Sequence, residues 1–378
     1  MIIRGFKTAA VAAGIKAGGA LDLALICSET PATAAAVFTQ NFFIAAPLLV
    51  TRRHLLASGH QVRAVLVNSG NANAATGDAG IQAAEECVEA LARELKCDAR
   101  DVLVSSTGVI GRPLPVTRIQ TAIPNLVSSL SPSNLEMLAR GIMTTDTVPK
   151  IATAEMGGAR IAGVAKGAGM IHPDMATMLS FVMTDADVAQ ADLDSALRYA
   201  VHHSFNSISV DGDTSTNDMV VVLANGASGI HPSAGDFRER LREVCTELAT
   251  AIVRDGEGAT KFVELNIEGA PSDDAARTIG RTIARSPLVK TAIYGADPNW
   301  GRIVGAIGNS GVPLRSDRVD IYIGGVPISD KTLEEARQKL KAREIQIRVV
   351  LHSGSGTARI WTCDLTEGYI RINADYTT

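Results

Sequence analysis

Thr177 stands in a setting that is typical of a candidate nucleophile. It lies near the end of a glycine-punctuated segment, KGAGMIHPDMATML at residues 166–179, where an apolar run begins at Met178. A threonine hydroxyl attacks carbonyl carbon poorly at neutral pH unless a base removes its proton. A cut between Ala176 and Thr177 would free an α-amine, with a pKa of about 7.7–8.0, to act as that base. The pattern alone favours a simpler interpretation, a turn leading into a core strand, because threonine is common at strand starts.

Motifs spread over the whole chain change this weighting. They include NSGNAN at 68–73, STGVIG at 106–111, TTDT at 144–147, SVDGDT at 209–214, DGEGATK at 255–261 and GADPNWGR at 295–302. Each motif is weak by itself, but so many in one order and at fitting intervals are very specific. Together with the Thr177 segment they resemble the ornithine acetyltransferase family, whose bifunctional members are glutamate N-acetyltransferases and ornithine acetyltransferases.

The resemblance implies a mechanism in which the chain first cuts itself. Thr177 Oγ would attack the carbonyl of Ala176, giving fragments 1–176 and 177–378, and would then attack the acetyl donor. Thr107 and Gly108 match the family's oxyanion hole. A hydroxyl and a glycine N–H can converge on one oxygen because glycine lets the backbone approach closely. Without the family match, these residues fit an ordinary turn at the end of a strand.

Three further residues match positions that bind the amino-acid substrate in this family, namely Thr144, Lys166 and Glu257. Ornithine carries a carboxylate and two amines. A lysine facing the carboxylate and a glutamate facing an ammonium group would complement it through charge-assisted hydrogen bonds. The structural alternatives are a solvated turn for Lys166 and a helix-terminating loop for Glu257. The neighbouring Thr145 competes with Thr144 for the substrate contact.

The last residues of the chain also resemble the family. There, an asparagine and a hydroxyl residue five positions later reach the substrate, and here these are Asn373 and Thr378. Chain ends usually fray and bind nothing. The resemblance therefore predicts a C-terminus that is tied down beside the substrate.

Length, composition and charge limit the classes of protein. The 378 residues predict two domains or one large layered unit, with a weak boundary near Ala270, and the 46% hydrophobic content suits a sizeable core. A net charge of −4 argues against a nucleic-acid partner, because there is no basic excess to neutralise phosphates. No apolar stretch approaches the roughly 18–20 residues that span a bilayer, so no membrane partner is expected.

Neither a metal site nor a disulfide framework is expected. The five cysteines are an odd number without CxxC spacing, which favours a reducing cytoplasm. The run from Asp211 to Asp218 begins like a calcium loop. It has Thr216 and Val222 where an EF-hand needs glycine and glutamate, so we reject that interpretation. The resemblance implies no metal or redox cofactor either.

Short apolar strands alternate with helical patterns along the chain. Helices are expected to cover 81–95, a segment with Asp192 as N-cap, a segment from near Asp236 to Asp255, and 333–340. Strands are expected at 62–67, 101–105, 179–184, 219–224, 262–267, 319–323, 346–351 and 359–363. This mixture predicts an α/β or α+β fold. The resemblance implies a layered sandwich of helices flanking stacked sheets, as in self-cleaving N-terminal-nucleophile enzymes.

The residues and the resemblance lead to one main hypothesis and two alternatives. The main hypothesis is transfer of the acetyl group from N-acetylornithine to glutamate through acetyl-Thr177, with ornithine released. Whether acetyl-CoA is also a donor stays open, and the family implies a heterotetramer of two α and two β fragments. One alternative is an N-terminal-nucleophile amidohydrolase or aminopeptidase, in which water is the acceptor. The other is a binding or interaction protein with an inert Thr177.

Overall fold

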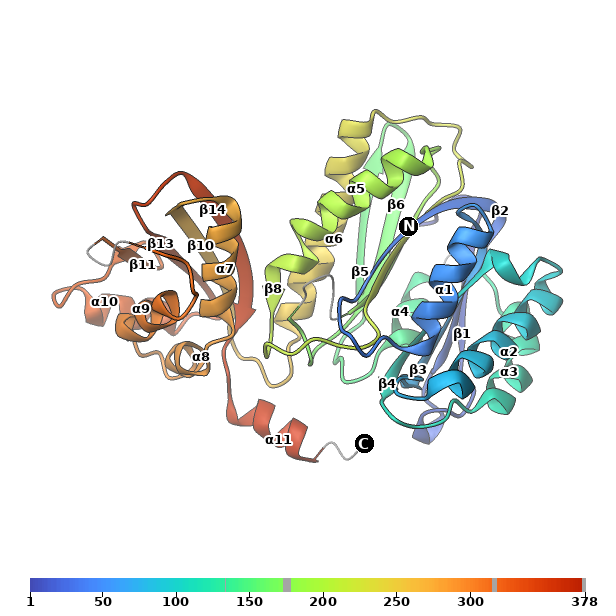
Figure 1. Ribbon diagram of the computed structural model, residues 1–378, viewed down its shortest axis with the longest axis horizontal. Helices are drawn as coiled ribbons and strands as arrows, with labels where there is room; N and C mark the ends of the chain where they lie inside the picture. The colour runs from blue at the N-terminus through green and yellow to red at the C-terminus, as the bar shows by residue number, and fades with distance from the viewer. Residues whose placement is uncertain (133, 173–177, 315–317, 376–378) are drawn as a thin grey trace.

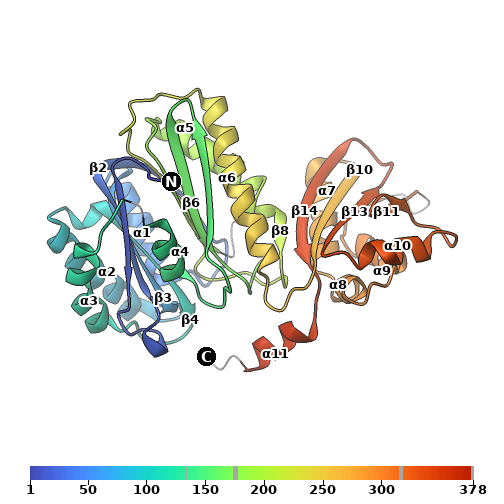
Figure 2. The same ribbon diagram turned by 180° about the vertical axis from the view of Figure 1, so that it is seen from behind.

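The computed structural model describes residues 1–132, 134–172, 178–314 and 318–375. The backbone forms a larger lobe up to about residue 260 and a smaller lobe over residues 261–366 (Figure 1). Seen from behind, the last helix leaves the smaller lobe and extends back toward the larger one (Figure 2). Three predicted site residues lie outside the described residues. They are Ala176 and Thr177 of the predicted cleavage site, in segment 173–177, and Thr378, in segment 376–378.

One mixed sheet organises the larger lobe. Its strands are β1 (Phe6–Val11), β2 (Leu23–Phe38), β3 (Gln61–Asn71), β4 (Val102–Val109), β5 (Lys150–Met156), β6 (Ala159–Lys166), β7 (Leu179–Thr184) and β9 (Met219–Ala224). They lie in the order β4-β3-β2-β9-β7-β6-β5, and β1 pairs with β2. β7 and β9 are parallel and buried along their whole length, which explains why both are mostly apolar.

Helices cover this sheet on both faces. They are α1 (Ala46–Ala57), α2 (Gly77–Leu95), α3 (Val116–Ser128), α4 (Leu135–Ile142), α5 (Gln190–His202) and α6 (Ala234–Arg254), with short 3₁₀ turns at Ala17–Gly19, Ala99–Asp101 and Phe205–Ser207. α5 and α6 share one buried apolar cluster with β6, β7 and β9, whereas α4 packs on the opposite side chains of the same strands. α1, α2 and α3 bury the strands at the β4 end.

A second sheet forms the smaller lobe. Its strands are β8 (Ile208–Ser209), β10 (Phe262–Ala270), β11 (Asp320–Ile323), β12 (Val326–Pro327), β13 (Glu344–Val350) and β14 (Gly356–Cys363). The helices are α7 (Asp273–Ala284), α8 (Pro287–Tyr294), α9 (Trp300–Gly308), α10 (Leu333–Leu340) and the terminal α11 (Glu367–Asp375). β8 pairs with β14, which ties this sheet to the chain of the larger lobe. The predicted boundary near Ala270 falls between β10 and α7, inside the smaller lobe.

The layered α/β prediction is confirmed, and each predicted strand is present with shifted ends or the same ends. Six observed strands, β1, β2, β5, β6, β8 and β12, were not predicted. Two helix starts are wrong. α2 begins at Gly77 and not at residue 81. α5 begins at Gln190 after Ala189, so Asp192 lies in its first turn and does not cap it. A carboxylate there still favours the helix through the helix dipole. The cap of α6 is Ser233, whose hydroxyl accepts a hydrogen bond from Asp236 N.

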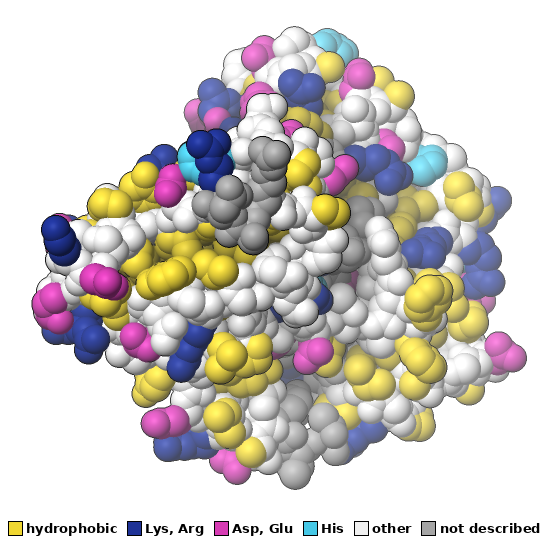
Figure 3. All heavy atoms as spheres, turned by 60° about the vertical axis from the view of Figure 1, so that its left-hand side comes forward, with side chains coloured by type: hydrophobic (Ala, Val, Ile, Leu, Met, Phe, Trp, Pro, Cys, Tyr) yellow, Lys and Arg dark blue, Asp and Glu magenta, His cyan; other side chains and the backbone are white. Residues whose placement is uncertain are grey.

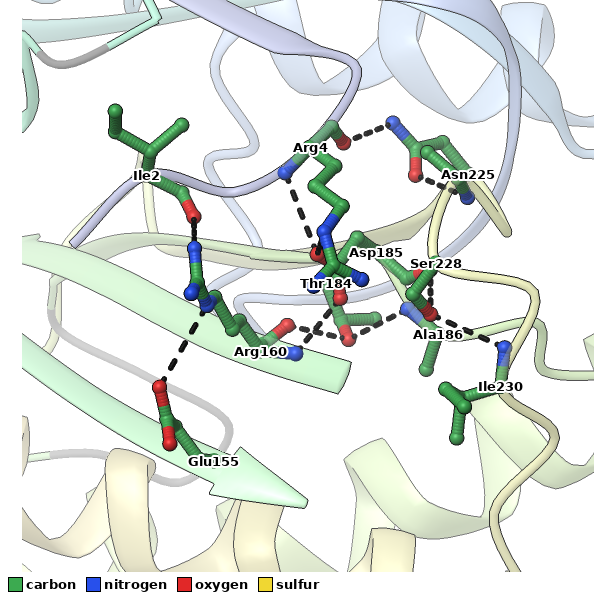
Figure 4. Close-up of polar contacts among 11 residues, drawn as sticks. Ile2, Arg4, Glu155, Arg160, Thr184, Asp185, Ala186, Asn225, Ser228 and Ile230 are labelled. Carbon is green, nitrogen blue, oxygen red and sulfur yellow. Dashed lines mark hydrogen bonds and ion pairs between the residues drawn. The ribbon is translucent and has the colours of Figure 1, made fainter. Parts of the chain in front are cut away.

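The N-terminal segment is fastened to the end of β7 that lies away from residue 178 (Figure 4). The fully buried Asp185 accepts hydrogen bonds from the backbone N of Arg160, at 2.7 Å, and of Arg4, at 3.4 Å. Asn225 Nδ2 donates to the Arg4 carbonyl at 3.0 Å. These contacts join residues that precede and follow position 177.

The surface shows no accumulation of one charge on the face that Figure 3 presents, where acidic and basic side chains are interspersed with hydrophobic ones. Within the described ranges, no helix is both long enough and apolar enough to cross a membrane. The five cysteines are free thiols.

Candidate active site

A pocket of about 260 Å³ lies where β4 and β6 end and where β7 and β9 begin. It brings together six of the predicted site residues, namely Thr107, Gly108, Thr144, Lys166, Glu257 and Asn373. It is also lined by Ile110, Thr145, Gly169, Met170, Met178, Leu179, Ser215, Asn217 and Asp218. Met178 and Leu179 follow Thr177 directly in the chain, so the described residues next to the predicted nucleophile belong to this pocket.

The predicted oxyanion residues lie near the C-terminal end of strand β4. The strand extends further than predicted, through Val109, so Thr107 and Gly108 are part of it rather than of a turn after it. Gly108 has φ +132°, and a Cβ there would lie 2.4 Å from the carbonyl carbon of Gly70 on β3. Only glycine fits a backbone this close at this torsion angle.

Asparagine side chains hold the backbone around the end of β4 in place through hydrogen bonds. Asn217 Nδ2 donates to the carbonyls of Ala72, at 2.6 Å, and Ser106, at 2.9 Å. Ser106 Oγ donates to Asn68 Oδ1 at 2.5 Å, and Asn68 Nδ2 donates to the Asn71 carbonyl at 2.9 Å. The NSGNAN motif therefore fixes the backbone beside Thr107 and Gly108, which is a structural role that its resemblance alone did not reveal.

Lys166 and Thr144 meet on the opposite wall of the pocket. Lys166 Nζ lies 3.3 Å from Thr144 Oγ1, and Thr145 lines the same wall. Burial lowers the pKa of Lys166, while Asp146 and Asp218 act in the opposite direction. The lysine thus ends β6 inside the protein and is not the solvated turn residue of the alternative interpretation.

A buried ion-pair network supports this wall from behind, and sequence reasoning missed it. Lys150 Nζ contacts Asp146 Oδ1 at 2.7 Å and Asp255 Oδ2 at 2.6 Å, and all three side chains are at most 7% exposed. Asp146 also accepts hydrogen bonds from the backbone N of Thr144, at 2.9 Å, and of Gly167, at 2.6 Å. Burial opposes ionisation of Asp146, but Lys150 and Lys166 outweigh it, so its pKa lies below its usual value.

We expect Lys150→Met to destabilise the fold by about 3–5 kcal/mol, because it leaves two buried carboxylates without their cation. The depressed pKa of Asp146 means that the stabilisation in the wild type is present above the unfolded-state pKa and is lost as pH falls. The deficit of the variant should therefore shrink in acid. Urea unfolding at several pH values measures this.

Arg240→Met is the matched control, because Arg240 pairs with Glu243 on the exposed face of α6. That change should cost no more than about 1 kcal/mol. An equal loss in both variants, independent of pH, would show that the buried network contributes no more than a surface pair.

Glu257 closes the pocket together with the C-terminal helix. Its Oε2 accepts a hydrogen bond from Asn373 Nδ2 at 2.8 Å, and its backbone N donates to the Ala168 carbonyl at 2.9 Å. α11 begins beside Gly258, where a Cβ would lie 2.2 Å from Tyr369 N. The loop after α6 thus carries Glu257 and also receives α11, which brings Asn373 to the site.

Asp211 fixes the loop that leads to the predicted cleavage site. Its carboxylate accepts hydrogen bonds from the backbone N of Met170, at 2.6 Å, and of Ile171, at 2.9 Å. Tyr369 of α11 donates its hydroxyl to the same carboxylate at 3.4 Å. Met170 has φ +55°, an uncommon value for a non-glycine residue, and it lines the pocket.

The end of the rejected calcium loop supplies three lining residues that the sequence analysis did not assign, Ser215, Asn217 and Asp218. The available signal was their place immediately before the strand 219–224, which pairs with the strand that follows Thr177. Among the described residues, no group of three or more His, Cys, Asp or Glu side chains is placed to hold a metal ion.

The fold and the pocket define a layered α/β enzyme for a small polar molecule, since the cavity is lined by hydroxyl, amide, carboxylate and ammonium groups and by close glycine backbone. Comparison with known proteins identifies the particular family. The ArgJ family model matches residues 7–378, and the chain belongs to this family.

Relatives match over their full length. The chain is 47% identical over 396 residues to the arginine biosynthesis bifunctional protein ArgJ of Geobacter sulfurreducens, covering 100% of both chains. It is 48% identical over 380 residues to the protein of the same name from Thermus thermophilus, covering 99% of this chain and 98% of the relative. The crystal structure of ArgJ from Bacillus halodurans matches with 47% identity and a TM-score of 0.51, covering 53% of this chain and 100% of that chain. These matches confirm the predicted family.

Proposed function

We propose that this protein is an acetyltransferase of arginine biosynthesis. It moves the acetyl group of N-acetylornithine to glutamate through an ester on Thr177, after cutting its own chain between Ala176 and Thr177. Membership in the ArgJ family and the names of its relatives support this proposal. The observation that carries it is the pocket itself, where residues from five distant parts of the chain meet directly beside Met178.

The chemistry follows from the lining groups. Thr177 Oγ is the nucleophile, and its freed α-amine is the general base. Thr107 Oγ and Gly108 N stabilise the negative oxygen of the tetrahedral intermediate, because fixed donors in a water-poor site need no reorganisation. Lys166 and Thr144 bind the substrate carboxylate, while Glu257 and Asn373 bind the far end of the substrate, and the family resemblance assigns Thr378 to the same end.

The length of one chain in the solved Bacillus halodurans structure supports the proposed cleavage before Thr177. The Bacillus halodurans chain matches over its whole length yet covers 53% of this chain, and residues 177–378 amount to 53% of the 378 residues. The fragments would remain one unit, because β7 and β9 pair with β6 and β2 across the cut. We propose a heterotetramer of two α and two β fragments that works in the cytoplasm without a metal or redox cofactor. Acetyl-CoA is a second donor to test.

The decisive experiment is incubation of the purified enzyme with N-acetylornithine alone. We expect one acetyl group on the fragment that begins with Thr177, and parallel double-reciprocal lines when glutamate is added, as ping-pong transfer requires. Mass spectrometry and initial-rate kinetics measure both. Intersecting lines without an acetylated fragment would contradict the ester intermediate.

The same assay separates the alternatives. Release of free acetate without glutamate would favour an amidohydrolase or aminopeptidase. A chain that stays uncut in active extract would favour a binding protein with an inert Thr177. Separate reactions with N-acetylornithine and with acetyl-CoA decide which donors are used.

A further inference from the structure

Asp218 is a buried carboxylate of the pocket that the mechanism above does not use. It is 2% exposed, and its Oδ2 has no hydrogen-bond partner in the part of the chain that the structure describes. It precedes β9, and Met219 N donates to the Met178 carbonyl at 3.1 Å, so Asp218 lies beside Met178 across the parallel pair β7–β9. An acceptor this deeply buried is costly to leave unpaired.

The charges around the pocket make Asp218 the carboxylate most ready to exchange a proton. Lys166 on β6 faces it, Glu257 and Asn373 on the opposite wall hydrogen-bond to each other, and Asp146 behind Lys166 is neutralised by Lys150. Burial raises the pKa of the Asp218 carboxyl well above its usual range, and Lys166 together with hydrogen bonds from Ser215 and Met178 offsets this only in part. Burial therefore favours the neutral acid of Asp218, whereas a second ammonium group close by would favour its carboxylate.

The proposed reaction needs a group that can give up a proton and later take one up. The reason is that the amine released in the first half-reaction and the amine that enters the second differ in protonation state. In the first half-reaction the amide C–N bond breaks and the hydroxyl proton of Thr177 reaches the leaving nitrogen, which gives a neutral amine. Ornithine leaves as an ammonium ion only if it takes one more proton. In the second half-reaction glutamate arrives as an ammonium ion and must lose one proton before its nitrogen can attack the ester.

We propose that Asp218 carries this proton from one half-reaction to the other, an inference that rests on the proposed function. The Asp218 carboxylic acid protonates the leaving amine of ornithine and becomes a carboxylate. That carboxylate then removes a proton from the α-ammonium of glutamate. The free amine forms the new C–N bond, the C–Oγ bond of acetyl-Thr177 breaks, and the amine's second proton returns to Oγ through the α-amine. Each cycle restores Asp218 as the acid, and no other reactant is required.

The test measures how fast a preformed acetyl-enzyme transfers its acetyl group to two acceptors. Glutamate must lose a proton first, whereas hydroxylamine is unprotonated at neutral pH. In Asp218→Asn, discharge to glutamate at pH 7 should fall about a hundredfold, the lower range for loss of a general acid–base group. Discharge to hydroxylamine should stay within about twofold. The glutamate deficit should narrow as pH rises, because more glutamate is then free amine.

Control variants separate a proton carrier from a structural residue. Asp192→Asn changes an exposed carboxylate in α5 and should leave both discharge rates unchanged. Equal losses with both acceptors, or a wild-type rate with glutamate, would overturn the proposal. If Asp218→Asn does not fold, Asp218→Glu is tested in its place. Its acetyl-enzyme should discharge more slowly than wild type to glutamate, in a pH-dependent way, but not to hydroxylamine. An equal loss of rate with hydroxylamine would overturn the role of Asp218 as proton carrier.

The experiment distinguishes failure of the proton-carrier role of Asp218 from failure of the proposed function. If the wild-type enzyme forms no acetyl-Thr177, the acetyltransferase mechanism itself is wrong. If the wild type forms it and Asp218→Asn discharges it normally to glutamate, only the role of Asp218 is wrong.

Discussion

Thr177→Ala is expected to yield a single uncut chain of 39.6 kDa that has lost acetyl transfer. The hydroxyl is the attacking group in both reactions, and without the cut the α-amine is not available as a base. We expect a loss of at least about a thousandfold in kcat/KM, in keeping with removal of a catalytic nucleophile. Thr177→Ser keeps the hydroxyl and should retain part of both activities. Denaturing electrophoresis, intact-protein mass spectrometry and transfer assays measure these effects.

Thr121→Ala is a suitable control, because its hydroxyl only donates to the Thr117 carbonyl on the exposed face of α3. That variant should cut itself and transfer acetyl groups normally. An uncut Thr177→Ala chain with near-normal transfer would require a different nucleophile. A cut Thr177→Ala chain would show that another residue, or another protein, performs the cleavage.

Local patterning was enough to predict three of the strands around the site, β4, β7 and β9, but not β6, which carries Lys166. Residues 179–184 and 219–224 are short, mostly apolar segments that end before Asp185 and Asn225, and they match β7 and β9 residue for residue. The start of α5 was missed because Asp192 looks like a cap, although the cap position is Ala189, three residues earlier. Strand order and the extension of β4 through Gly108 depend on pairing with distant strands, which single-segment patterns do not encode.

The residues of the site likewise fall into those that the sequence predicted and those that it did not. The resemblance named six of the residues that line the pocket, and the structure places those six together. It did not name Lys150, whose two carboxylate partners are 4 and 105 residues away in sequence. Such groups look like ordinary surface charges in a sequence, because only the folded chain buries them together. Asp218 escaped notice for the same reason.

The arrangement of the sheet explains how a chain can cut itself in its centre and keep its fold. Every strand that borders the cut pairs with a strand from the other fragment, and Asp185 adds polar contacts to Arg4 and Arg160 at the far end of β7. Cutting one peptide bond removes none of these contacts. A chain end at the predicted cut would directly precede Met178, which lines a pocket whose walls are fixed by Asp211, Asp146 and Asn217.

Gly108→Ala is expected to produce the second largest loss. The new Cβ would lie 2.4 Å from the Gly70 carbonyl carbon and 2.6 Å from Asn71 N, both of them backbone atoms that cannot rotate away. With φ at +132°, β4 must shift, and the donors at Thr107 and Gly108 shift with it. Loss of one oxyanion donor costs about 10²–10³ in kcat, and self-cleavage should slow as well because it passes through the same kind of intermediate.

Steady-state transfer and the rate of chain cutting measure this loss, and a melting curve shows whether the fold survives. Gly305→Ala is the control, since a Cβ there meets no atom within 4 Å and Gly305 lies inside helix α9, where alanine is favoured. That variant should be as active and at least as stable as the wild type. Normal cutting and transfer by a folded Gly108→Ala enzyme would remove Gly108 from the oxyanion hole and leave Thr107 to act with another donor.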